Sequence, residues 1–139
     1  MQPKLTLTHT VPDEDREAIL AELLDYNNEI LGESSRGEIY IPLKDQEGET
    51  EGGLIGYIGR GWLYIELLFV PDHLRDKGLA GKMLRMAEEE AKDRGCTGVY
   101  IDTLNPIARR VYERQGYEAF STLDGFSKGS SLTWLKKKF

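Results

Sequence analysis

Cysteine is almost missing from this 139-residue sequence, in which Cys96 is the only one. A single cysteine excludes an internal disulfide and a thiolate metal cluster. Histidine is scarce as well, and His9 and His73 lie too far apart to show the spacing of a metal-binding pair. We therefore expect no metal site. Cys96 follows a glycine at the end of a predicted helix, and we expect it to be a buried packing residue rather than a nucleophile.

Long apolar runs are also missing, since none approaches the roughly 18 residues that a membrane-spanning helix needs. The first ten residues, MQPKLTLTHT, lack the charged start and apolar block of a signal peptide. We therefore expect a cytoplasmic protein with no membrane partner. The length fits one domain, residues 1–139, with a core of its own.

Positive charge is in deficit, with 18 Lys and Arg against 24 Asp and Glu and a net charge of −6. Nucleic-acid binding needs a basic surface that releases counterions, so we expect no nucleic-acid partner. This balance does not forbid a small anion at a local basic spot. It would suit a cationic substrate, but a mildly acidic surface is more often a matter of solubility.

Hydrophobic periodicity and turn residues predict a mixed α/β chain. The expected strands are residues 4–8, 38–43, 53–58, 62–70, 99–103, 117–123 and 131–135. The expected helices are residues 13–31, 78–94 and 105–115, the first opened by a threonine cap and an early proline. A strand, a helix and a strand over residues 62–103 form a right-handed crossover, so these two strands should be parallel. We predict a mostly antiparallel sheet with this one parallel crossover and flanking helices.

The segment RDKGLA, residues 75–80, stands between a buried strand and a long predicted helix. A helix N-terminus offers free backbone N–H groups and partial positive charge, and Gly78 lets the backbone approach a ligand closely. These features suit a pyrophosphate. Alone, the hexamer is a weak signal, because a capped helix with two solvated bases would look the same. The sequence has no P-loop and no G-x-G-x-x-G fingerprint.

A second motif follows, with a strand, a helix led by Asn105, and Tyr112-Glu-Arg-Gln-Gly-Tyr117. Together the two motifs resemble those of the GNAT superfamily of N-acetyltransferases, which carry [QR]-x-x-G-x-[GA] and Tyr-x-x-x-Gly-[FY] in this order. Ala80 stands where many members have glycine, and alanine is an accepted alternative there. The part of the chain before residue 65 matches only in its order of elements.

The resemblance implies acetyl-CoA as the donor and a fold whose two parallel strands splay apart. Backbone N–H groups would hold the pyrophosphate in the segment Arg75, Asp76, Lys77, Gly78, Leu79, Ala80 and Gly81. The strand end would pair with the pantetheine amides through Leu68, Phe69 and Val70. Asn105 would hydrogen-bond the cofactor arm, and Ala108 and Arg109 would line it.

Acetyl transfer to an amine needs a base, an oxyanion donor and an acid. Glu66 is the candidate base, because it interrupts an apolar strand on the face of Leu68 and Val70 by alternation; a strand-edge or salt-bridged glutamate is the alternative. A backbone N–H near Leu68 is the implied oxyanion donor. Tyr112, beside the cofactor, is the candidate acid for the departing thiolate, and a packed helix aromatic is its alternative.

The predicted function is transfer of an acetyl group from acetyl-CoA to a primary amine of a small molecule or peptide. Transfer is expected by direct attack in a ternary complex, and a non-catalytic acyl-CoA-binding sensor or interaction module is the alternative. A homodimer through the C-terminal strands is a further expectation. Trp62, Tyr64 and Trp134 are expected as core or rim aromatics, one of which an acceptor pocket could use.

Overall fold

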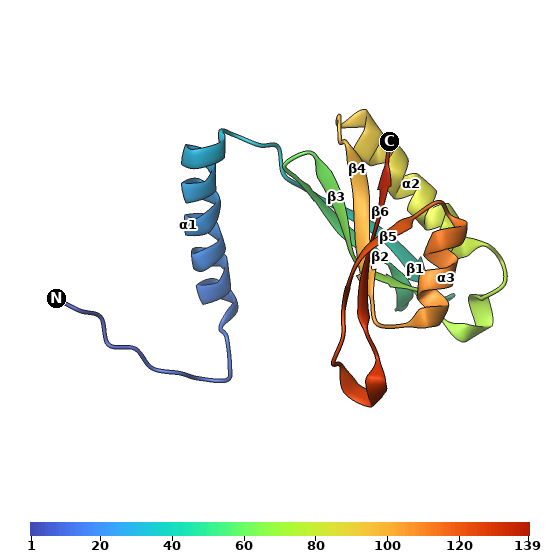
Figure 1. Ribbon diagram of the computed structural model, residues 1–139, viewed down its shortest axis with the longest axis horizontal. Helices are drawn as coiled ribbons and strands as arrows, with labels where there is room; N and C mark the ends of the chain where they lie inside the picture. Colours follow the sequence, from blue (N-terminus) through green and yellow to red (C-terminus); the bar gives the residue numbers. More distant parts are fainter. The chain divides into compact units, whose positions relative to one another are not determined.

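The computed structural model describes all residues, 1–139, which form two compact units, residues 1–34 and 35–139. Figure 1 shows the course of the chain through both. The first unit contains α1, Asp13–Leu31, with the predicted bounds. Gly32 follows it with a φ of 82°, as expected of a glycine that ends a helix.

Two predictions for the first unit are wrong. Residues 4–8 form no strand, because alternation alone does not make a strand without a partner to pair with. The threonine cap is also absent: Pro12 occupies the N-cap position, where no side chain accepts a bond from the first turn. Its fixed φ and the acidic residues at positions 13–15 favour the helix start instead.

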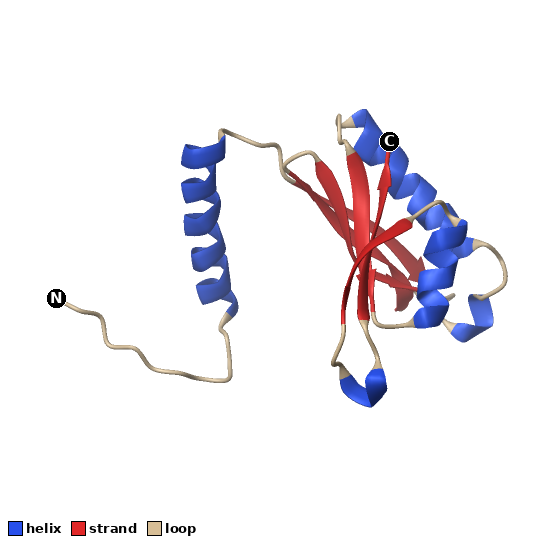
Figure 2. Ribbon diagram, in the orientation of Figure 1, coloured by secondary structure: helices blue, strands red, loops and turns tan.

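The second unit is built on one six-stranded sheet (Figure 2). Its strands are β1 (Gly37–Lys44), β2 (Thr50–Gly59), β3 (Trp62–Phe69), β4 (Gly98–Thr103), β5 (Glu118–Leu123) and β6 (Leu132–Lys138). Their spatial order is β1-β2-β3-β4-β6-β5. Only β3 and β4 pair in parallel, and every other pair is antiparallel. The predicted fold class is confirmed, including its parallel crossover.

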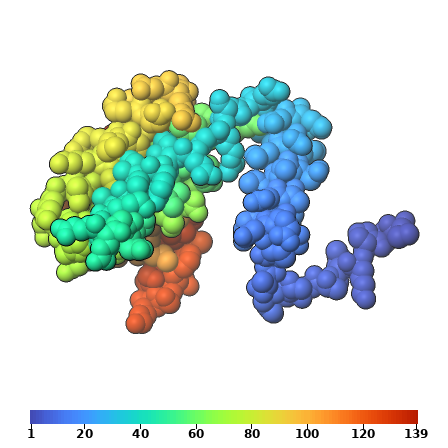
Figure 3. Space-filling view, turned by 180° about the vertical axis from the view of Figure 1, so that it is seen from behind, coloured from blue at the N-terminus to red at the C-terminus, as the bar shows by residue number.

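Two helices, α2 (Leu79–Asp93) and α3 (Pro106–Arg114), pack on the core of this sheet. The largest fully buried side chains are Leu54, Leu63, Ile65, Leu84, Leu135 and Val99. Cys96 is buried as predicted. The space-filling view shows the β5–β6 hairpin projecting from this unit (Figure 3). No helix has both the length and the apolar composition for crossing a membrane.

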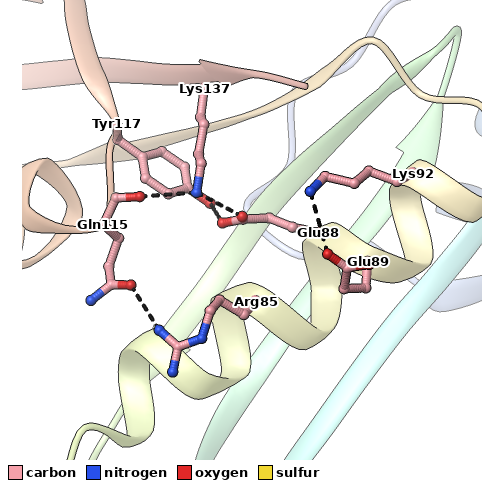
Figure 4. A network of polar contacts seen from close by, with 7 residues as sticks. All are labelled: Arg85, Glu88, Glu89, Lys92, Gln115, Tyr117 and Lys137. Atoms are coloured by element: carbon pink, nitrogen blue, oxygen red, sulfur yellow. Dashed lines mark hydrogen bonds and ion pairs between the residues drawn. The ribbon is translucent and has the colours of Figure 1, made fainter.

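The apolar face of α2 differs from the expected one at two positions. Met86, predicted to be buried, is exposed, whereas Glu88, expected on the solvated face, is only 3% exposed. The carboxylate of Glu88 is fully used (Figure 4). It accepts hydrogen bonds from Lys137 Nζ at 2.8 Å and from the Tyr117 hydroxyl at 2.7 Å. Partners distant in the sequence therefore compensate for the burial of this charge.

Candidate active site

The two parallel strands separate half-way along their length. Pairing between β3 and β4 begins at Trp62 and Gly98 and stops at Ile65 and Ile101, although β3 continues to Phe69. The far side of β3 stays paired with β2 up to Phe69. The backbone N–H and C=O groups that β3 turns toward β4 therefore lack a strand partner beyond Ile65. Such an edge can pair with an extended ligand in the manner of one more strand.

A β-bulge lies at the point of separation. Ile65 is paired with Gly56 and Leu67 with Ile55, so Glu66 has no opposite residue in β2. The alternation used to place Glu66 is therefore interrupted at this residue. Glu66 is exposed and does not line the cavity described below. Its role as a base stays a prediction.

The start of α2 is open to a ligand. Gly78 is the N-cap, with a φ of 73° and no side-chain capping bond. A Cβ placed on it would meet no atom within 4 Å. The first turn of a helix has N–H groups without intrahelical partners. Together with the partial positive charge of the helix end, these groups make an anion-binding position.

The two basic residues before this helix behave differently. Arg75 donates from Nε to the carbonyl of Val70 at 2.9 Å and pairs with Asp72 at 3.4 Å. It thereby fixes the turn between β3 and α2. Lys77 is exposed and does not line the cavity. The backbone, more than the basic side chains, therefore forms the anion-binding surface.

A cavity of about 540 Å³ joins the open edge of β3, the start of α2 and one face of α3. It is lined by most residues that the resemblance implied, namely Leu68, Phe69, Val70, Arg75, Asp76, Gly78, Leu79, Ala80, Gly81, Asn105, Ala108 and Tyr112. Arg109 lies outside it and lines a neighbouring cavity of about 380 Å³ with Lys128 and Ser130. The structure thus brings the two sequence motifs to one site.

Sequence reasoning missed five residues of this lining, which are Leu74, Ile107, Val111, Arg114 and Gln115. A signal was present for two of them, since Val111 and Gln115 repeat at helical spacing after the predicted Ala108. Gln115 is held in place by Arg85, which donates to its Oε1 at 3.2 Å. The lack of a side chain at Gly81 accommodates it, because a Cβ there would lie 2.7 Å from Gln115 Nε2.

The side chain of Asn105 caps α3 with its oxygen and leaves its NH₂ group to bind a ligand. Its Oδ1 accepts a hydrogen bond from the N–H of Ile107 at 2.9 Å and so caps α3, as the sequence predicted. Its own N–H is bonded to the hydroxyl of Thr103 at 3.0 Å. Asn105 lines both cavities. With the oxygen used by the cap, the side-chain NH₂ is the group that can donate to a ligand.

Tyr112 is the one tyrosine that lines the cavity, and its phenol is the candidate acid. It is 6% exposed, and its ring lies 6.3 Å from that of Tyr117. Burial, assisted by the negative charge of Asp102, raises the pKa of Tyr112 from 10.0 to about 12. The phenol therefore stays protonated at neutral pH and can donate a proton.

Comparison with known proteins decides the family. A model of the acetyltransferase (GNAT) family matches residues 5–117. The chain belongs to the GNAT family. It is 46% identical to an acetyltransferase of Agrobacterium fabrum over 133 residues, which are 96% of this chain and 97% of that one. A crystal structure assigned as an acetyltransferase of Agrobacterium tumefaciens superposes with a TM-score of 0.91 at 44% identity, covering 99% and 100% of the two chains.

A second similar protein is the blasticidin-S acetyltransferase of Streptomyces morookaense. It is 31% identical over 94 residues, 67% of this chain and 69% of that one. Since GNAT acetyltransferases use acetyl-CoA, the chain is an acetyl-CoA-dependent acetyltransferase. The site fits that donor, with an open helix start for phosphates and an unpaired strand edge for amides. No group of three or more metal-ligating side chains is assembled in the structure.

Proposed function

We propose that this GNAT protein acetylates the primary amine of a small molecule or peptide by direct attack on acetyl-CoA in a ternary complex. The observation that carries the proposal is the cavity itself, which joins an open strand edge, an uncapped helix start and the protonated phenol of Tyr112. The similarity to a blasticidin-S acetyltransferase supports a small-molecule acceptor.

Each segment has a part in this proposal. The N–H groups between Arg75 and Gly81 hold the pyrophosphate, and the open edge at the end of β3, continued by Val70, bonds the pantetheine amides. The Asn105 NH₂ donates to the same arm. A strand N–H near Leu68 faces the carbonyl oxygen that becomes negative during attack, where one such donor is worth about 3 kcal/mol.

The transfer balances with one acid and one base. The acceptor ammonium first loses a proton, for which Glu66 or a water leading to it is the proposed acceptor. The neutral nitrogen forms a bond to the acetyl carbon, the C–S bond breaks, and the sulfur takes the proton of Tyr112. The surplus proton on nitrogen then passes through solvent to the Tyr112 phenolate, and Glu66 releases its proton to solvent. Cys96, the sole cysteine, is buried, and burial raises its pKa, which disfavours an acetyl-cysteine intermediate.

Replacing Tyr112 by phenylalanine is expected to lower kcat about 100-fold, the lower end of the range for a general acid, because a thiolate leaves fairly well unaided. The KM for acetyl-CoA should change less than about twofold, since the ring is retained. Because the pKa of Tyr112 is raised to about 12, the deficit should be the same throughout the pH range in which the phenol stays protonated. Steady-state rates from neutral pH up to about pH 10 measure both effects.

A matched control for this substitution is Tyr40→Phe, which removes the hydroxyl of an exposed tyrosine on β1. It should leave kcat unchanged. Equal rates for Tyr112→Phe and Tyr40→Phe would remove Tyr112 from the chemistry and leave it a packing residue.

The nature of the acceptor is tested by product analysis. Acetyl-CoA and the protein are incubated with pairs of compounds that differ only in carrying an amine or a hydroxyl, and products are identified by mass and NMR. We expect acetylated amines and no acetyl esters. Ester products alone would contradict the amine proposal while leaving the acetyltransferase assignment intact. The homodimer and the cytoplasmic location stay predictions. Of the C-terminal strands, β5 lies at an edge of the sheet.

A further inference from the structure

Three tyrosines form a row across the middle of the sheet. Tyr57 on β2 is paired with Tyr64 on β3, and Tyr64 is paired with Tyr100 on β4. The Tyr57 and Tyr64 rings meet edge-on at 5.5 Å, and the Tyr64 and Tyr100 rings stack at 4.9 Å. The neighbours of Tyr64, Leu63 and Ile65, are buried in the core with α2. By alternation the row therefore lies on the sheet face opposite that core.

Asp102 adds a carboxylate to this row. It lies two residues after Tyr100 on β4, hence on the same face, and accepts the Tyr64 hydroxyl at 2.6 Å. Pairing of β3 and β4 ends at Ile101, so Asp102 is the first residue of β4 beyond the separation. The cavity reaches this separation from the other strand through Leu68. The negative charge of Asp102 also contributes to the raised pKa of Tyr112, which places the two within electrostatic reach.

Charged groups around the row favour a cation near Asp102. The Arg36 guanidinium lies 4.7 Å above the Tyr57 ring, so the outer end of the row already holds a cation. Glu38, paired with Tyr57, adds negative charge there. Two positive charges oppose a further cation. Arg36 is engaged at the far end over Tyr57. Lys136, paired with Tyr100, has its ammonium 5.3 Å over the Phe120 ring on β5. Aromatic faces beside a carboxylate are the usual protein surface for organic ammonium groups.

We propose that Asp102 receives the ammonium group of the acceptor, with Tyr64 orienting the carboxylate and the tyrosine row carrying the rest of an organic cation. The acceptor class is then a small aliphatic amine with cationic character, presented at the separation of β3 and β4. This inference rests on the proposed function, because the bound amine is an acetyl acceptor only if the protein acetylates amines. Binding of a cation at Asp102 does not depend on it.

Equilibrium binding tests the site without catalysis. Trp62 lies 6.2 Å from Tyr100, and Trp134 is paired with Asp102, so tryptophan fluorescence reports on the row. We expect saturable fluorescence changes with 1,4-diaminobutane or with agmatine, and none with 1,4-butanediol. Asp102→Asn should weaken binding at least tenfold, and Tyr64→Phe about three- to fivefold. Failure of the unaltered protein to bind either amine would overturn the inference.

A matched control is Asp124→Asn, because Asp124 also accepts a hydroxyl bond, from Ser131 at 2.6 Å, in an exposed loop. It should bind the amines as the unaltered protein does. Equal affinity in Asp102→Asn and Asp124→Asn would overturn the inference even if both bind well. The melting-temperature rise with CoA should be the same in all variants, which shows that the Asp102 variant is folded.

Kinetics then separate the two proposals. If amines are acetylated and Asp102→Asn raises their KM at least tenfold with a much smaller change in kcat, the site is the acceptor subsite. Acetylation with an unchanged KM in Asp102→Asn defeats the inference and leaves the proposed function standing. Amine binding that requires Asp102, together with no release of CoA from acetyl-CoA, defeats the proposed function and leaves a cation site.

Discussion

Gly78→Glu is expected to weaken acetyl-CoA binding by at least 100-fold. The substitution places a carboxylate at an uncapped helix start, where the site offers N–H groups and partial positive charge to phosphates. A non-glycine residue at a φ of 73° adds strain of about 1–2 kcal/mol. Space is not the difficulty, because a Cβ at Gly78 would meet no atom within 4 Å. Isothermal titration with acetyl-CoA measures the loss.

Gly48→Glu is the matched control for this prediction. Gly48 has a φ of 83° in the turn between β1 and β2, and a Cβ on it would also meet nothing within 4 Å. It carries the same backbone strain and the same added charge away from the cavity. Its affinity for acetyl-CoA should equal that of the unaltered protein. If both variants bind alike, the segment 75–80 is a helix start without a ligand-binding role.

Glu88→Ala should lower the free energy of unfolding by about 3–5 kcal/mol, the range for breaking a buried ion pair from one side. The substitution leaves the Lys137 ammonium and the Tyr117 hydroxyl without their shared carboxylate (Figure 4). Lys137 retains one bond, to the carbonyl of Gln115 at 3.0 Å, which places the effect at the lower end of that range. Urea unfolding measures the change.

The adjacent Glu89 gives the control for this substitution. Its side chain is 70% exposed and pairs with Lys92 at 3.3 Å on the same helix. Surface pairs of this kind contribute at most about 0.5 kcal/mol, so Glu89→Ala should be nearly neutral. Similar losses in the two variants would show that the buried network does not set the effect, since alanine is the better helix former at both positions.

The stability that Tyr117 contributes through this network depends on pH. Burial and the adjacent Glu88 carboxylate raise the pKa of Tyr117 far above its ordinary value of 10.0. A group whose pKa is raised by folding contributes stability that is complete below the unfolded pKa and is lost as pH rises toward the folded value. Its contribution is therefore complete below about pH 10 and declines only in more alkaline solution.

The order of elements from α1 onward could be predicted from the sequence because each of them has a local cause. Gly32, Gly78 and Asn105 mark helix ends through backbone conformation or capping, and all three occupy those positions in the structure. The parallel pair followed from the handedness of crossovers, which depends on strand twist and not on particular side chains. Such rules need no knowledge of distant contacts.

The predictions that depended on distant contacts were less secure. Glu88 looks like a surface residue until Lys137 and Tyr117, far along the chain, supply its partners. The role of Glu66 stays a prediction, and the alternation on which it rests is interrupted by a bulge in the pairing of β2 with β3. The segment 4–8 alternates as a strand does and has no strand to pair with. Each of these depends on what another part of the chain provides, which local pattern cannot show.

The functional site was predictable in outline for a related reason. Gly78 and Tyr112 belong to short motifs whose spacing is visible in the sequence, and the fold brings both to one cavity. The association of Asp102 with Tyr64 was not visible, since it depends on the register of β3 against β4. Register across a parallel crossover is set by packing over the intervening helix.

The most direct test of acetyl transfer to an amine is a single-turnover reaction of the preformed acetyl-CoA complex. The complex is mixed with an amine and quenched at intervals, and CoA thiol, acetylated amine and intact protein mass are quantified together. The proposed function predicts that thiol and product appear at one rate in equal amounts, while the protein never gains an acetyl group. Thiol released before the amine is added, or acetyl retained on the protein, would contradict direct transfer; no release with any amine would contradict the enzyme.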